Sequence, residues 1–221
     1  MKFKATDNLN LRSGPSVTSP AIGQIPAGTI VESDEYTWKA VTLPDGKKGF
    51  CAAAYLQAVP EPPPMQWSRP MPAAKFVVTQ TYLKQDWTLY PKFGHHTGVD
   101  YGAQGQTGIP LFACADGEIV YREVANSTWG ASLGNHAALY VPSVDKSFLY
   151  CHMAAAPHAL GMVKSGDQIG IMGQTGLSAG IHLHLEGFHG RFNIAQRTFA
   201  SLNDIKQKTF DADLFIRPRV S

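Results

Sequence analysis

The stretch Ile181-His182-Leu183-His184-Leu185 alternates apolar and polar side chains at every step. Successive side chains of a β-strand point to opposite faces of the sheet, so this alternation favours a strand over a helix. The two leucines then point into a core, whereas His182, His184 and Glu186 share the other face and point into a cleft. The stretch therefore predicts a β protein in which one strand carries two imidazoles into a functional site.

A second short piece, His96-Thr97-Gly98-Val99-Asp100, supplies one more imidazole and a carboxylate. A metal ion needs only one imidazole of the His182/His184 pair, and the other stays free for proton transfer. Three protein ligands and one open position are how a catalytic zinc is held, whereas a closed structural site recruits a fourth protein ligand. A single histidine would more simply be a structural or surface residue, but the two pieces together predict a zinc hydrolase.

Two further segments have the character of short strands. Residues 148–153 read as one strand, which places His152 on the same face as Tyr150. Residues 161–176 form a string of very short strands broken by glycines, with an evident turn at residues 164–167.

In these segments the chain resembles the lysostaphin-type, or LytM-like, zinc metalloendopeptidases, which cut peptide bonds in bacterial peptidoglycan. The resemblance covers roughly residues 73–190, and its segments occur in the family's order. They are residues 96–103, 108–111, 115–120, 150–153, 166–176 and 182–186. The resemblance implies a lysostaphin-type peptidase domain built on an antiparallel β-sheet, and a wall-degrading activity.

The resemblance also implies roles for individual residues. The ligands of one zinc ion per chain would be His96, Asp100 and His184. His182 would be the general base, and His152 would orient the attacking water or stabilise the oxyanion. Tyr90 lies where some members carry an oxyanion-stabilising tyrosine, although a packed loop aromatic is an equal interpretation.

Elementary chemistry agrees with this assignment. Two neutral imidazoles and one carboxylate leave zinc with a net positive charge, which polarises a scissile carbonyl and lowers the pKa of a bound water to about 7. A neutral imidazole is a suitable base near neutral pH, and the chain has no H-E-x-x-H motif that would supply a glutamate instead. Glu186 either orients one of the imidazoles or is a surface strand residue.

The remaining histidines and the cysteines do not fit a metal site. The histidines expected to have structural roles are His95, His136, His158 and His189. The three cysteines, Cys51, Cys114 and Cys151, are widely spaced without a C-x-x-C pair, which disfavours a thiolate zinc site. A protease that pairs Cys151 with a histidine is a weak alternative, because strand alternation turns Cys151 away from its neighbour His152.

The N-terminal part resembles bacterial SH3-like domains, which often accompany wall hydrolases and are thought to bind wall peptide. Short predicted strands separated by turn signals suggest a small barrel. They lie in residues 9–16, 22–31, 38–43, 49–51 and 55–56. Tyr36, Trp38 and Phe50 are candidates for a binding groove, and the alternative is that the domain is only a spacer.

The sequence predicts a mainly β chain with three parts: an SH3-like domain over residues 1–59, a proline-rich linker over 60–72, and the peptidase domain over 73–221. After Glu186 the family pattern weakens. Residues 194–202 are compatible with a short helix, and residues 211–215 resemble a degenerate form of the family's closing strand.

Composition fits a folded enzyme of 221 residues and two modest domains, with 44% hydrophobic residues. A net charge of +2 gives no case for nucleic acid, and no run is long enough to span a membrane. We expect a monomer whose partner is the peptide of bacterial peptidoglycan, in the periplasm or outside the cell. The start of the sequence shows no apolar targeting segment, so delivery by a phage or an injection particle, or prior removal of a signal, is expected.

Two other functions remain open. One is a catalytically silent LytM-like protein that binds and activates another wall hydrolase, which the presence of every ligand disfavours. The other is a zinc amidase that cuts between sugar and stem peptide with the same metal chemistry.

Overall fold

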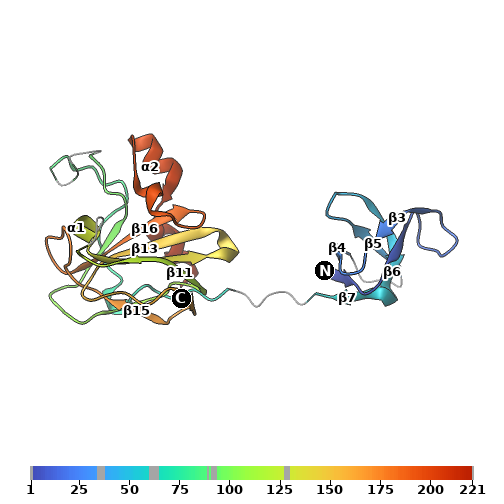
Figure 1. Ribbon diagram of the computed structural model, residues 1–221, viewed down its shortest axis with the longest axis horizontal. Coiled ribbons are helices and arrows are strands. Elements are labelled where there is room, and N and C mark those ends of the chain that lie inside the picture. Colours follow the sequence, from blue (N-terminus) through green and yellow to red (C-terminus); the bar gives the residue numbers. More distant parts are fainter. Residues whose placement is uncertain are drawn as a thin grey trace. The chain divides into compact units, whose positions relative to one another are not determined.

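The computed structural model describes residues 2–33, 38–59, 65–88, 90, 94–126 and 130–220. The chain divides into two compact units, Met1–Pro64 and Met65–Ser221. Each unit is built on antiparallel β-sheet, so the predicted mainly β fold is confirmed (Figure 1).

The first unit is a small β domain with its own core. Its described strands follow the order β3-β2-β6-β5-β4-β1-β7. They are β1 (Lys2–Ala5), β2 (Leu9–Arg12), β3 (Ala21–Ile25), β4 (Ile30–Glu32), β5 (Trp38–Thr42), β6 (Lys48–Ala52) and β7 (Leu56–Ala58), with the 3-10 helix η1 (Ala53–Tyr55) before β7. Alternate residues, among them Phe3, Leu11 and Val41, point inward and form the core.

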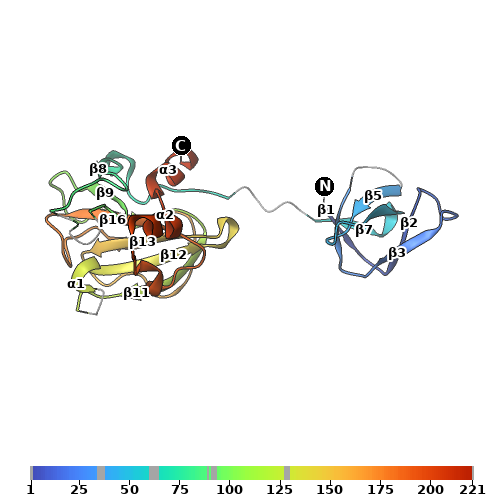
Figure 2. The ribbon, with the colours of Figure 1, turned by 90° about the horizontal axis from the view of Figure 1, so that it is seen from above.

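The second unit is dominated by one antiparallel sheet with the described order β14-β11-β12-β13-β16-β9-β8 (Figure 2). Its strands are β8 (Val78–Gln80), β9 (Val99–Gly102), β11 (Gly117–Glu123), β12 (Asn135–Val141), β13 (Lys146–Met153), β14 (Gly161–Val163) and β16 (His182–His189). A short strand β17 (Thr209–Phe210) pairs with β16. A separate ladder joins β10 (Pro110–Phe112) to β15 (Gln168–Ile171).

Both faces of the main sheet are covered, because alternate residues of its strands enter two different cores. Leu183 and Leu185 of β16 lie in the core that also holds residues of β10 and β15. Leu149 of β13 and Phe188 of β16 lie in the core that holds Ile205. Figure 1 accordingly shows α2 (Leu202–Lys208) on one side of the sheet and β15 on the other.

The helices of the second unit are short, and two predictions about its C-terminal part are wrong. The helices are η2 (Ala73–Lys75), α1 (Gly130–Leu133), η3 (Pro142–Val144), η4 (Ile194–Arg197), α2, α3 (Ala212–Ile216) and η5 (Arg217–Arg219). The expected helix at 194–202 is only the 3-10 helix η4, and the expected strand at 211–215 is the helix α3. Asp211 starts α3 because its side chain accepts a hydrogen bond from the backbone N–H of Leu214 at 3.1 Å. None of the helices in the described ranges has the length and apolar character needed to cross a membrane.

The proline-rich segment ends earlier than the expected boundary at residue 73. Trp67 packs edge-on against Phe148 with ring centroids 6.0 Å apart, and Met71 is buried. The backbone N–H of Ser68 donates to Cys114 O at 2.8 Å. Residues 65–72 thus belong to the second unit by their contacts, while residues 60–64 lie outside the described residues.

Candidate active site

The two sequence pieces that suggested a metal site are neighbours in the sheet. Strands β9 and β16 run antiparallel, and their register sets His184 directly opposite Asp100. Residues next to them, Leu183 and Tyr101, are fully buried in the core on the other face. The prediction that His184 shares the face opposite the leucines is therefore confirmed.

Three atoms from these pieces form a compact triangle. His184 Nδ1 lies 2.8 Å from Asp100 Oδ1 and 2.9 Å from His96 Nε2, and the third side, from His96 Nε2 to Asp100 Oδ1, is 3.1 Å. Tetrahedral zinc with bonds of about 2.0–2.1 Å separates its ligand atoms by about 3.3 Å, so the donor set fits zinc in chemistry and nearly in size. His96, Asp100 and His184 form the one such cluster in the described part of the chain.

His96 reaches the triangle from the segment that leads into β9. Its Nδ1–H donates to Thr81 O at 3.1 Å, which leaves the Nε2 lone pair facing the other two residues. Gly98 allows this close approach, because a Cβ there would lie 2.6 Å from Leu185 O and 2.9 Å from His184 Nε2. The glycine in the H-T-G-V-D piece is therefore a packing requirement of the site.

The electrostatics of the triangle favour a carboxylate at Asp100. Burial raises the pKa of Asp100, but hydrogen bonds with His184 and His96 hold that pKa well below its usual range. Burial would lower the pKa of His184, but hydrogen bonds with Asp100 and Glu186 raise it to about 9. Both shifts favour an attraction between a charged His184 and a charged Asp100, and a cation bound between these residues would take the place of the shared proton.

His152 enters the site through an irregularity in β13, and the predicted face for it is wrong. Tyr150 and Met153 both lie in the same core, although strict alternation would put them on opposite faces. The register between β12 and β13 shifts here, and His152 adopts the left-handed φ of 60°. This β-bulge turns His152 away from the side of Tyr150, so that its ring centroid lies 5.9 Å from that of His184.

His152 and His182 lie side by side with their ring centroids 4.7 Å apart. The Nδ1–H of His152 donates to Thr175 O, and the Nδ1–H of His182 donates to Gly180 O, each at 2.8 Å. In the neutral form of each ring, these bonds leave Nε2 as an acceptor. His182 Nε2 lies 3.8 Å from Asp100 Oδ1, and burial together with the nearby His184 lowers the pKa of His152 to about 4.

Tyr90 lies beside the triangle as a packed aromatic. Its ring stacks on that of His96, with centroids 5.2 Å apart and planes 25° apart. Its hydroxyl donates to Gln80 Oε1. The stack supports the ring of His96, and the oxyanion role of Tyr90 stays a prediction.

Glu186 is a buried partner of the site, which excludes the surface-residue interpretation. Its side chain is fully buried, and its Oε1 accepts from His184 Nε2 at 2.9 Å. Thr97 and Arg197 also donate to this carboxylate. Sequence reasoning missed both donors. The position of Thr97 between His96 and Gly98 could have pointed to it. Nothing in the sequence pointed to Arg197, because the course of the chain after β16 was not predicted.

The other histidines and the cysteines are not part of the triangle, although Cys151 pairs with His184 across β13 and β16. His158 and His189 are exposed, His95 is half-buried beside Trp87, and His136 is a buried residue of β12 whose Nδ1 bonds Gly134 O. All three cysteines are free and buried. Burial raises the pKa of Cys114 to about 12 and that of Cys151 well above its ordinary value, so neither is a reactive thiolate, and the Cys–His protease is disfavoured.

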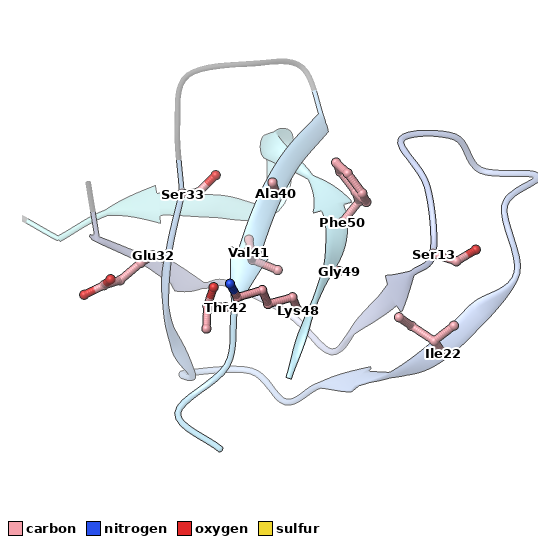
Figure 3. A pocket seen from close by; sticks show the side chains of 10 residues that line it. All are labelled: Ser13, Ile22, Glu32, Ser33, Ala40, Val41, Thr42, Lys48, Gly49 and Phe50. Atoms are coloured by element: carbon pink, nitrogen blue, oxygen red, sulfur yellow. The ribbon is translucent and has the colours of Figure 1, made fainter. Parts of the chain in front are cut away.

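Phe50 and Trp38, two of the three aromatic candidates of the first unit, line different hollows. Phe50 lines a hollow of about 690 Å³ together with Val41, Lys48 and Glu32 (Figure 3). Trp38 lines a different hollow of about 320 Å³. Tyr36, the third candidate, lies outside the described residues.

Two known proteins match part of this chain in sequence. The chain is 38% identical over 91 residues to the DD-carboxypeptidase/endopeptidase Mpg of Neisseria meningitidis serogroup B, a match covering 41% of this chain and 19% of that protein. It is 36% identical over 95 residues to an uncharacterized metalloprotease of Haemophilus influenzae, covering 42% of this chain and 18% of that protein. The chain thus spans about a fifth of the length of these relatives.

Solved structures share the fold. The antimicrobial peptidase lysostaphin from Staphylococcus simulans superposes with a TM-score of 0.51 at 22% identity, covering 69% of this chain and 55% of that one. LytU superposes with a TM-score of 0.50 at 22% identity, covering 69% of this chain and 91% of that one. Residues 94–194 match Peptidase family M23, and residues 7–57 match the bacterial SH3 domain. The chain therefore carries a Peptidase family M23 domain, which follows a bacterial SH3 domain.

Proposed function

We propose that this protein is a zinc-dependent endopeptidase that hydrolyses peptide bonds in bacterial peptidoglycan. The observation that carries the proposal is the triangle of His96, Asp100 and His184, with two further imidazoles beside it. The match of residues 94–194 to Peptidase family M23 supports a peptidase, and the name of the Neisseria relative, a DD-carboxypeptidase/endopeptidase, supports the cleavage of peptide bonds.

The residues divide the chemistry among them. His96, Asp100 and His184 would hold the zinc ion, which in such a site polarises a carbonyl and lowers the pKa of a bound water to about 7. His182 accepts a proton from the attacking water at Nε2, because its Nδ1–H is already engaged by Gly180 O. His152 has the same tautomer and a low pKa, so it acts as a hydrogen-bond acceptor that orients the water.

The two alternatives differ in how well they fit these residues. A silent binding protein has no need of a complete donor set, and all three donors are within 3.1 Å of one another here. A zinc amidase would use the same groups on a different bond, so only the reaction products separate it from an endopeptidase. Because the substrate lies in the cell wall, we propose that the protein acts there, as a monomer.

We propose further that the SH3 domain binds wall peptide at the hollow lined by Phe50 (Figure 3). Ile22 and Phe50 supply an apolar surface, and the ammonium of Lys48 and the carboxylate of Glu32 supply opposite charges. A short peptide that carries both free amines and free carboxylates complements this mixture.

Metal analysis tests the proposed function. Purified protein should hold one zinc ion per chain, and His96→Ala, Asp100→Ala and His184→Ala should each lose it, because two ligands do not hold zinc tightly. His158→Ala, which removes an exposed histidine outside the triangle, is the matched control and should keep the ion. Full zinc content in all three ligand variants, measured on folded protein by elemental analysis, would contradict the assignment.

A further inference from the structure

The carboxylate of Glu186 is the most heavily bonded group next to the triangle. The side chain of Glu186 has no exposed surface, and that of Arg197 is 14% exposed. Arg197 Nε donates to Glu186 Oε2 at 2.7 Å, and Arg197 Nη2 donates to Oε1 at 2.6 Å. This is a two-point guanidinium–carboxylate fork, which fixes the plane of the carboxylate as well as its position.

The fork decides which nitrogen of His184 carries the proton. A carboxylate is an acceptor only, so the 2.9 Å bond between His184 Nε2 and Glu186 Oε1 requires a proton on Nε2. Nδ1 faces Asp100 and His96, so when a cation takes the place of the proton that Nδ1 shares with Asp100, the ring keeps its proton on Nε2 and presents its lone pair at Nδ1. Glu186 therefore selects the tautomer in which His184 can bind a cation in the triangle.

Arg197 holds Glu186 in this arrangement from outside the sheet. It lies at the end of η4, whose start is fixed by a capping box in which the side chains of Asn193 and Gln196 bond each other's backbone N–H groups. Gln196 Nε2 also donates to His189 O at the end of β16. A buried carboxylate without a cation is strongly destabilising, so the guanidinium also makes the burial of Glu186 possible.

We propose that Arg197 is a positioning residue of the metal site, which acts through Glu186 to fix the ring orientation and tautomer of His184. This inference rests on the proposed function, because it assumes that the triangle holds zinc. It gives a role to the segment after β16, which the sequence left without one.

The test is the zinc affinity of the full-length protein, measured by competition with a chromophoric chelator and without any substrate. Arg197→Gln removes the fork and should weaken zinc binding by about 10- to 100-fold, the range found when outer partners of metal-bound histidines are removed. Arg197→Lys keeps the charge but offers no planar fork, so its loss should be smaller. Arg191→Gln is the matched control, because Arg191 makes the same kind of fork with Glu118 on the surface, and it should bind zinc like the unchanged protein.

Circular dichroism of each metal-free variant shows whether it is folded. A folded Arg197→Gln protein that binds zinc as tightly as the Arg191→Gln control overturns the inference. If Arg197→Gln fails to fold, Arg197→Lys decides, and wild-type zinc affinity in that variant overturns the need for the fork. An unchanged protein that binds no zinc at all contradicts the proposed function instead, so the two failures are distinguishable.

Discussion

His152 occupies the site in a backbone conformation that few residues other than glycine adopt. A left-handed φ of 60° at a non-glycine residue costs on the order of 1–3 kcal/mol and persists only where the surroundings enforce it. Here the bulge in β13 and the bond from His152 Nδ1–H to Thr175 O enforce it. This backbone conformation places the imidazole of His152 beside that of His182, whereas a regular strand would have turned His152 into the core.

At the residue scale, we expect substitutions of the catalytic histidines to spare zinc binding, unlike substitutions of the zinc ligands. His182→Ala and His152→Ala should keep zinc and fold but lose turnover by about 100- to 10,000-fold, because each removes a group that handles the water's protons. Rates on a soluble peptide, paired with zinc content, provide the measurement, and His158→Ala is the control. Near-normal rates in both variants would remove these histidines from the mechanism.

The sequence predicted the residues whose roles follow from local spacing. The alternation around His184 and the four-residue step from His96 to Asp100 are visible without any structure. The face of His152 was not predictable, because a bulge inserts a residue that alternation cannot anticipate. Arg197 was not predictable either, since its contact with Glu186 depends on how the chain turns after β16.

At the element scale, the site depends on how closely the segment before β9 approaches β16. The register pairs His184 with Asp100, and Gly98 passes the backbone of Leu185 with no space for a side chain. The distance between the side chains of His96 and His184 thus depends on how closely the two backbone segments approach each other.

Gly98→Ala should therefore damage the site without touching a ligand. Its new methyl group must push the segment away from β16, which should cost about 1–3 kcal/mol of stability and weaken zinc binding. Gly180→Ala is the control, because a Cβ there meets no atom within 4 Å. Thermal unfolding and chelator competition measure both effects, and a Gly98→Ala protein that matches Gly180→Ala would refute this dependence.

The elements themselves were predictable to different degrees. The segments of β13 and β16 were identified correctly as strands, and both of their faces are buried. The short stretch at 211–215 was assigned to a strand although it forms α3. Its helix rests on the Asp211 cap and on the ion pair between Asp213 and Arg217 four residues later, both of which outweigh a brief apolar pattern.

At the scale of the whole molecule, each unit has a separate hydrophobic core. The proline-rich stretch predicts a linker up to residue 72, but residues 65–72 contact the second unit through Trp67 and Met71. The expected end of the linker differs from the contacts of residues 65–72 because prolines predict an extended backbone but do not indicate which side chains pack against a domain.

A chain that begins at Met65 should therefore fold and cleave a soluble peptide at close to the full-length rate. It should bind intact sacculi more weakly, because tethering to the SH3 domain raises the local concentration of the peptidase at the wall without altering its site. Pelleting with sacculi and peptide kinetics measure the two parts. If the shortened chain is folded yet inactive on the small peptide, the SH3 domain must contribute to catalysis.

Mass spectrometry of the fragments released from purified peptidoglycan tests the central claim most directly. The zinc-loaded protein should release peptides with a new amino terminus and a new carboxyl terminus within the stem or crosslink, and chelation or His182→Ala should abolish them. Cleavage only between the sugar and the stem peptide would identify an amidase instead. No fragments from several wall types, with zinc bound, would contradict the account.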